Sequence, residues 1–97
     1  MPKGYWIGHV DIENADNYPL YMKAAQPAYE KYGARFLVRG GRSEQVEGAG
    51  RKRHVVVEFD SYEKAVACYN SPEYQAAAKI RRANSTGDIL IVEGAGG

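Results

Sequence analysis

Cysteine is almost absent from this sequence, since Cys68 is the only one among 97 residues. A single thiol argues against an intramolecular disulfide and against a zinc site built from several cysteines. Because Cys68 lies beside a helical stripe of apolar residues, we expect a buried, unreactive thiol. Long apolar runs are also absent, which argues against a secretory signal and a membrane span. We therefore expect a cytoplasmic protein without a membrane partner.

An excess of charge of either sign is missing as well. The sequence has 13 basic and 12 acidic residues, and its formal net charge at pH 7 is +1. Nucleic-acid binding would need a coherent basic face. We therefore expect no nucleic-acid partner, and we expect the short basic runs at residues 51–53 and 79–82 to be solvated surface. The length predicts one domain, residues 1–97.

Phenylalanine and tryptophan are scarce, with two Phe and one Trp against eight Tyr. Tyrosine buries like other aromatic residues but keeps a hydroxyl that needs a hydrogen-bond partner. Most of the tyrosines fall on apolar stripes of predicted helices. They predict a layer of hydroxyl groups between the helices and a sheet.

Alternating and β-branched residues predict four strands, at residues 4–11, 34–39, 53–60 and 88–93. Helical segments separate the first strand from the second and the third from the fourth. The order βαββαβ is that of the ferredoxin-like α+β fold, an antiparallel four-stranded sheet with its helices on one face.

Capping signals bound the predicted helices. The first helix starts after Asp16 or Asn17 and stops at Gly33. The second follows Ser61, and a further helix restarts after Ser71 and Pro72. Residues 84–87 are expected to form a loop.

Side-chain alternation gives the predicted sheet two different faces. One face is apolar and takes the helices. The other collects ionisable residues, yet it also exposes apolar ones, namely Tyr5, Ile7, Leu37, Val56 and either Leu90 with Val92 or Ile89 with Ile91. This is a larger apolar patch than is usual on a soluble monomer. A second copy of the same sheet is the simplest cover, so we expect a homodimer.

Four stretches resemble one known family: GYWIGHVD at residues 4–11, YGARFLVRGG at 32–41, VVEFDSY at 56–62 and YNSPEYQ at 69–75. The chain resembles the domain-of-unknown-function 1330 family, within the dimeric α+β barrel superfamily. The resemblance implies a homodimer whose two sheets face each other as a barrel. It implies no particular reaction, because relatives by fold include cofactor-free monooxygenases, lactone isomerases and haem-dependent chlorite dismutases.

The candidate site lies on the ionisable face, where alternation places His9, Asp11, Arg39 and Glu58 together. Arg39 would anchor a carboxylate or a carbonyl oxygen through its fork of donors. His9 would be the acid/base, because an imidazole titrates near neutral pH. The same residues also suit an ion-pair network within a dimer interface, with Arg39 bound to Glu58 and His9 to Asp11 or to a partner residue.

Tyr69 is a further candidate for substrate binding, because the turn at residues 69–72 would place its hydroxyl at the mouth of a cleft. Helix capping by Ser71 and Pro72 explains the same turn without a ligand. No cofactor is expected, since Gly48-Ala49-Gly50 lacks the third glycine and the context of a dinucleotide loop. No metal is expected, since the two histidines lack a diagnostic spacing.

Two functions therefore stay open. In the first, the protein is a homodimer that binds a small organic carboxylate or carbonyl compound, as a binding protein or as a cofactor-free isomerase or monooxygenase. In the second, it is a non-catalytic dimeric module whose polar sheet face only specifies the dimer.

Overall fold

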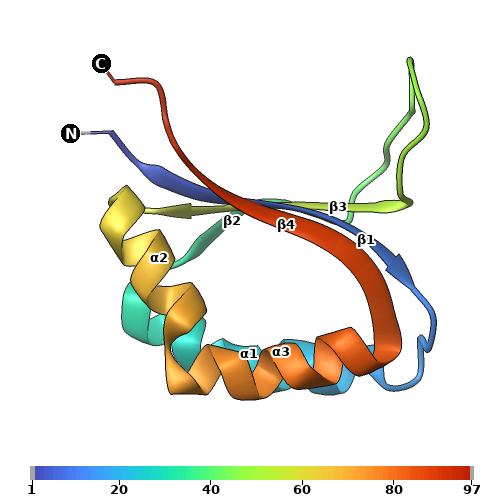
Figure 1. Ribbon diagram of the computed structural model, residues 1–97, viewed down its shortest axis with the longest axis horizontal. Helices are drawn as coiled ribbons and strands as arrows, with labels where there is room; N and C mark the ends of the chain where they lie inside the picture. Colours follow the sequence, from blue (N-terminus) through green and yellow to red (C-terminus); the bar gives the residue numbers. More distant parts are fainter. Residues whose placement is uncertain (1, 97) are drawn as a thin grey trace.

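In the computed structural model, which describes residues 2–96, four strands form one antiparallel sheet and three helices cover one of its faces (Figure 1). The elements are β1 (Gly4–Ile12), α1 (Tyr18–Tyr32), β2 (Arg35–Arg39), β3 (Arg53–Phe59), α2 (Tyr62–Asn70), α3 (Pro72–Asn84) and β4 (Ser85–Glu93). The strand order is β2-β3-β1-β4, which confirms the ferredoxin-like α+β fold. None of the described helices is long and apolar enough to cross a membrane. Met1 and Gly97, the ends of the expected domain, lie outside the described residues.

The helix ends follow the capping signals with one exception. Gly33 ends α1 with a φ of 69°, in the left-handed region that favours glycine. Ser61 and Ser71 each accept a hydrogen bond from the backbone N–H three residues later, at 3.1 and 3.2 Å. Asn17 occupies the N-cap position of α1 but makes no side-chain cap. Instead, the side chain of Asn14 accepts bonds from the two backbone N–H groups just before the helix.

The loop expected at residues 84–87 is wrong, because α3 passes directly into β4. The side chains of Asn84 and Ser85 bond back to carbonyls in the last turn of α3, at 2.8 and 2.6 Å, so the helix end needs no further cap. Thr86 and Gly87 then pair with the end of β1. A Cβ at Gly87 would lie 2.8 Å from the backbone oxygen of His9, so this close approach requires glycine.

Strand β2 contains an irregularity that the alternation pattern did not predict. Phe36 pairs with Val57 and Arg39 with Val55, and the register shifts between Phe36 and Val38. Leu37 is the extra residue of this bulge, and side chains after it change face. Arg39 therefore lies on the helix side of the sheet. The expectation that it shares a face with His9 is wrong.

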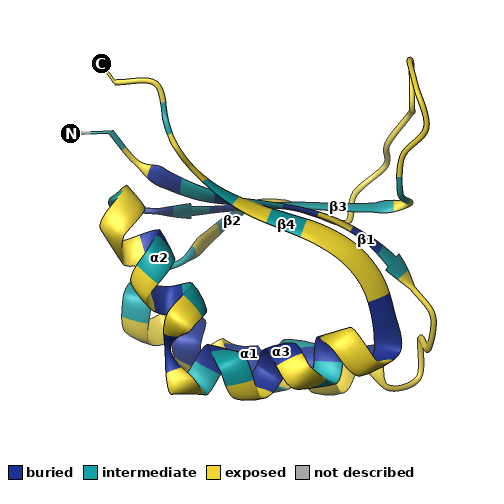
Figure 2. Ribbon diagram, viewed as in Figure 1, coloured by how far each residue is buried: buried dark blue, intermediate teal, exposed yellow. Residues whose placement is uncertain are grey.

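Buried residues alternate with more exposed ones along β1, whereas β4 at the edge of the sheet is mostly exposed (Figure 2). The helix side holds the core, in which Trp6, Phe59 and Tyr74 pack with ring centroids 5.0 and 4.7 Å from the indole. The Trp6 indole N–H donates to the Ala65 carbonyl at 2.9 Å. We call the opposite side the outer face. It exposes large apolar side chains, namely Leu37, Val38, Leu90 and Val92. Leu37, Leu90 and Val92 belong to the predicted patch, whereas Val38 was expected on the helix side and is moved to the outer face by the bulge.

Candidate functional site

A cavity of about 40 Å³, partly open to solvent, lies between the helix side of the sheet and helices α1 and α3. We call it the main cavity. Apolar side chains form much of its wall, namely Trp6, Val10, Met22, Val55 and Ile89. Tyrosine hydroxyls and arginine guanidinium groups supply its polar atoms. A cavity lined by both aromatic rings and arginines suits an organic ligand with an apolar body and a polar end.

Three tyrosine hydroxyls meet in the wall of this cavity. The hydroxyl of Tyr21 lies 2.7 Å from that of Tyr74 and 3.2 Å from that of Tyr29. All three residues are buried, and this burial raises the pKa of each hydroxyl above its ordinary value. They are therefore neutral at physiological pH and able to donate hydrogen bonds. The predicted layer of hydroxyl groups between helices and sheet is confirmed.

Three arginines line the same cavity, and none of them pairs with a carboxylate among residues 2–96. Arg81 is buried, with 6% of its surface exposed. The Nε atoms of Arg53 and Arg81 are buried without a hydrogen-bond partner. Arg39 lies at the rim, with its guanidinium 3.9 Å from the centre of the Phe36 ring. Buried guanidinium groups normally have an anionic partner, so this cavity is electrostatically suited to an anion.

The positions of Arg53 and Arg81 contradict the expectation that the two basic runs are solvated surface. Arg53 is in phase with Val55 on β3, so its side chain points toward the helices. Arg81 lies one turn after Ala77 and Ala78 on the buried stripe of α3. The spacing of both arginines indicated a buried position, since each is in phase with buried residues of its own element. The prediction of a surface position rested on their charge alone.

His9 lies on the outer face, away from the main cavity. Its Nδ1 is 2.8 Å from Nδ1 of His54, which is directly opposite on β3. Both histidines line a separate cavity, which is more open to solvent than the main cavity and lies beneath the long loop between β2 and β3. Arg51 and Asp88 also line it. Within residues 2–96, no three His, Cys, Asp or Glu side chains form a group that could hold a metal ion.

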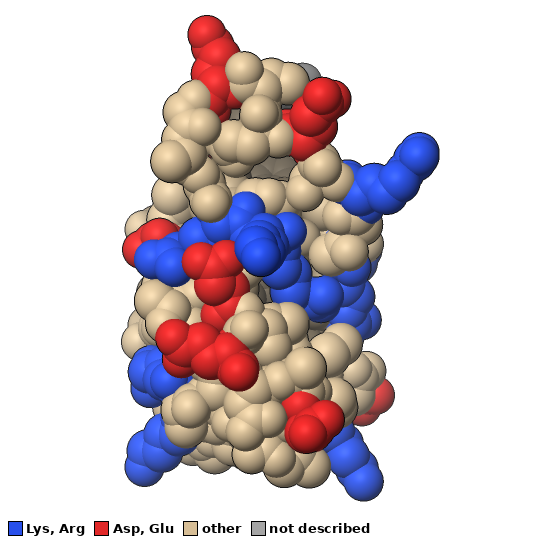
Figure 3. All heavy atoms as spheres, turned by 90° about the vertical axis from the view of Figure 1, so that its right-hand side faces the viewer, with Lys and Arg blue, Asp and Glu red and all other residues tan. Residues whose placement is uncertain are grey.

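Asp11 and Glu58 share the outer face with His9, as alternation predicted, but both are engaged in local ion pairs. Asp11 accepts bonds from Arg51 Nη1 at 3.1 Å and from the Lys52 backbone at 3.0 Å. Figure 3 shows this end of the molecule, where acidic and basic side chains are intermixed below the long loop. Asp11 therefore ties that loop to β1.

Glu58 accepts bonds from Arg35 Nε and the Tyr5 hydroxyl, both at 3.0 Å. The Arg35 guanidinium, and after it the Tyr5 hydroxyl, lower the pKa of the Glu58 carboxyl. The ion pair considered between Arg39 and Glu58 is not formed, because the bulge puts Arg39 on the other face and leaves Arg35 beside Glu58.

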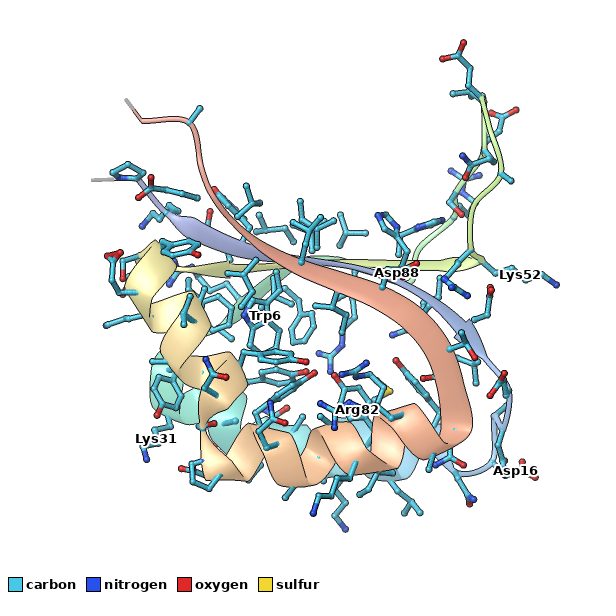
Figure 4. All side chains as sticks on the ribbon, viewed as in Figure 1. Trp6, Asp16, Lys31, Lys52, Arg82 and Asp88 are labelled. Atoms are coloured by element: carbon cyan, nitrogen blue, oxygen red, sulfur yellow. The ribbon has the colours of Figure 1, made fainter. Side chains whose placement is uncertain are left out.

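Tyr69 lies at the end of α2 and faces a second cavity, between α3 and β4. Its ring packs against those of Trp6 and Tyr74, with centroids 5.8 and 5.4 Å away. In Figure 4, Trp6 lies beneath the sheet, and Arg82, which also lines the second cavity, extends from α3. Of the candidates from the sequence, only Arg39 lines the main cavity and only Tyr69 lines the second.

The fold is shared with several solved structures of low sequence identity. A Rhodopseudomonas palustris protein of unknown function superposes with a TM-score of 0.79 at 16% identity, over 99% of this chain and 85% of that one. A dimeric ferredoxin-like protein of unknown function from Jannaschia sp. CCS1 gives 0.71 at 17% identity, over 94% and 96%. SnoaB, a cofactor-independent oxygenase from Streptomyces nogalater, gives 0.67 at 10% identity, over 100% and 97%.

These likenesses establish the fold alone, because the identities are low. A search of curated proteins finds no match. One family model covers nearly the whole chain, from residue 3 to residue 95, and it describes a domain of unknown function. By that match, the chain belongs to the DUF1330 family.

Proposed function

We propose that this protein binds a small organic molecule with an apolar body and a carboxylate or carbonyl oxygen, and that the ligand occupies the main cavity. One observation carries the proposal: three arginines without carboxylate partners share a cavity with aromatic and aliphatic walls. An arginine presents a planar fork of donors that matches a carboxylate. The same cavity removes the apolar part of the ligand from water, which favours binding by about 25 cal/mol per Å².

The tyrosine hydroxyls add directional contacts to this attraction. Because burial keeps Tyr21 and Tyr74 neutral, either hydroxyl can donate to a ligand oxygen. A donor already held by its neighbour loses little freedom when the ligand arrives. The hydroxyls therefore favour an oxygen-bearing ligand over a purely apolar one.

In an enzymatic form, the site would serve a cofactor-free isomerase or monooxygenase. Both reactions pass through an oxyanion formed by loss of a proton from the substrate, and arginine and tyrosine donors stabilise such a charge. SnoaB, described as a cofactor-independent oxygenase, has a similar fold, which supports an enzymatic role of this kind. Among the described residues, however, no imidazole or carboxylate lines the main cavity to accept the proton. The geometry therefore supports ligand binding more directly than turnover.

We also infer that the protein forms a homodimer through the outer face. Leu90 is 51% exposed and Leu37 is 55% exposed on this face, and a structural relative is described as dimeric. Sedimentation at micromolar concentration tests the inference, with a dimer expected for the native chain and a monomer for Leu90→Asp. Leu20→Asp, which alters an equally exposed leucine on α1, is the control and should stay dimeric. A native monomer at that concentration would refute it.

The binding proposal is tested by calorimetry with 2-naphthoate and its neutral amide. The native protein should bind the acid more tightly than the amide, because the carboxylate carries a charge for the arginines while the amide offers only a neutral carbonyl oxygen. Arg53→Met should weaken binding at least tenfold, since charge-assisted hydrogen bonds are lost. Arg42→Met, which removes an exposed arginine of the long loop, should have no effect. Equal binding of acid and amide would refute an arginine-dependent site.

The alternative function, a non-catalytic dimeric module, predicts different results for two variants. If the polar outer face only specifies the dimer, 2-naphthoate does not bind, and His9→Ala weakens dimerisation while Arg39→Ala does not. On our proposal, Arg39→Ala weakens ligand binding and His9→Ala does not, because the sheet separates His9 from the main cavity.

A further inference from the structure

The second cavity, between α3 and β4, adjoins the main cavity. It is more open to solvent than the main cavity and has a volume of about 310 Å³. The two cavities share two lining residues, Arg81 and Ile89. Arg81 and Ile89 therefore lie at the boundary between the two cavities.

The second cavity is also basic. Arg81 and Arg82 both line it, and neither lies within ion-pair distance of a carboxylate among residues 2–96. The described side-chain contact of Arg82 is with the neutral amide of Gln75, at 3.3 Å. Thr86 also lines this cavity, but its hydroxyl donates to Glu13 at 2.8 Å. The two guanidinium groups are thus the cationic groups that a second anion would meet.

Charge balance across both cavities points to the class of ligand. Four arginines line the two cavities together, namely Arg39, Arg53, Arg81 and Arg82. One carboxylate compensates one of these charges, and the others stay without a partner. A molecule with an anionic group at each end compensates two of the four charges, one in each cavity.

We propose that the ligand is an elongated dianion with an apolar centre, which places one anionic group in the main cavity and the other beside Arg82 in the second cavity. This inference rests on the proposed function, because the inner group occupies the site described there. Tyr69 contributes to binding of the end of the ligand that lies in the second cavity, since Tyr69 lines that cavity.

The test compares naphthalene-2,6-dicarboxylate with its monomethyl ester, by calorimetry on the full chain. The diacid should bind about tenfold more tightly, since the second carboxylate adds a charge-assisted pair. Arg82→Gln should remove that difference and leave the affinity for the half-ester unchanged. Lys79→Gln, which removes one positive charge from an exposed position of the same helix, should preserve the difference.

Two results would overturn the inference while the proposed function stands. The diacid and the half-ester bind equally well to the native chain, or Arg82→Gln weakens both ligands by the same factor. Either result would show that Arg82 does not hold a second anionic group of the ligand. Absence of binding by both ligands would instead overturn the proposed function together with this inference.

Discussion

Replacing Arg81 by methionine should make the free protein more stable and abolish ligand binding. Arg81 is 6% exposed and its Nε lacks a hydrogen-bond partner. A buried polar group without a partner costs about 1–3 kcal/mol of stability. Methionine keeps the apolar stem and removes the guanidinium. The free energy of unfolding should therefore rise by about 1–3 kcal/mol.

The assay is urea unfolding at one fixed protomer concentration, because dimerisation makes apparent stability depend on concentration. Thermal unfolding provides a second measure, since 1 kcal/mol moves the midpoint by about 4–8 °C in a domain of this size. A carboxylate ligand at a hundred times its Kd should stabilise the native protein by about 2.7 kcal/mol and leave Arg81→Met unchanged. Added ligand should thus reduce the difference in the free energy of unfolding between Arg81→Met and the native protein, or make the native protein the more stable of the two.

Two outcomes would refute this reasoning. If Arg81→Met lowers the free energy of unfolding, contacts of Arg81 with its neighbours outweigh the cost of burying it. If the variant is still stabilised by the ligand, Arg81 does not hold the anion. Arg42→Met is the control for loss of a positive charge, because Arg42 is exposed, and neither its stability nor its binding should change.

Three further predictions follow from buried or paired groups. Tyr74→Phe removes the hydroxyl that lies 2.7 Å from that of Tyr21 and should lower the free energy of unfolding by about 1–3 kcal/mol in urea. The Glu58 carboxyl has a pKa below its ordinary 4.5, first because of Arg35; its stabilising effect is therefore complete above pH 4.5 and is lost as pH falls through the lower folded pKa. Glu58→Gln should reduce the loss of stability at acid pH, measured as unfolding midpoints over a pH series. An unchanged loss would contradict a stabilising role of the Glu58 carboxylate. Burial raises the pKa of the Cys68 thiol to about 12, so a thiol reagent at pH 8 should react only in denaturant, and rapid reaction with the folded chain would contradict this.

Much of the fold could be predicted from local signals, because each signal has a direct physical cause. Ser61 and Ser71 each precede a helix, because their hydroxyl oxygens accept hydrogen bonds from backbone N–H groups of the first turn. Gly33 ends a helix since it adopts a positive φ. Residues 84–87 could not be predicted, because their polar composition suggests a loop while pairing with β1 extends the strand. That pairing is a tertiary contact, and single-sequence patterns do not contain it.

The candidate site was predicted less well than the fold, and the reason lies in one residue. Alternation assigns faces correctly only while every residue has a partner on the neighbouring strand. Leu37 has none, and this bulge moves Arg39 from the outer face to the cavity. Arg53 and Arg81 were missed for a different reason, since their charge outweighed a spacing that placed both among buried residues.

The bulge also connects the two surfaces that otherwise lie on opposite sides of the sheet. Leu37 and Val38 are 55% and 42% exposed on the outer face, and Arg39 follows them at the rim of the main cavity. In the homodimer that we infer, a second copy packed on these two side chains would hold the bulge in place. It would thereby hold Arg39 on the cavity side. Loss of the dimer should then weaken the contribution of Arg39 to ligand binding and leave that of Arg81, which is held by α3, unchanged.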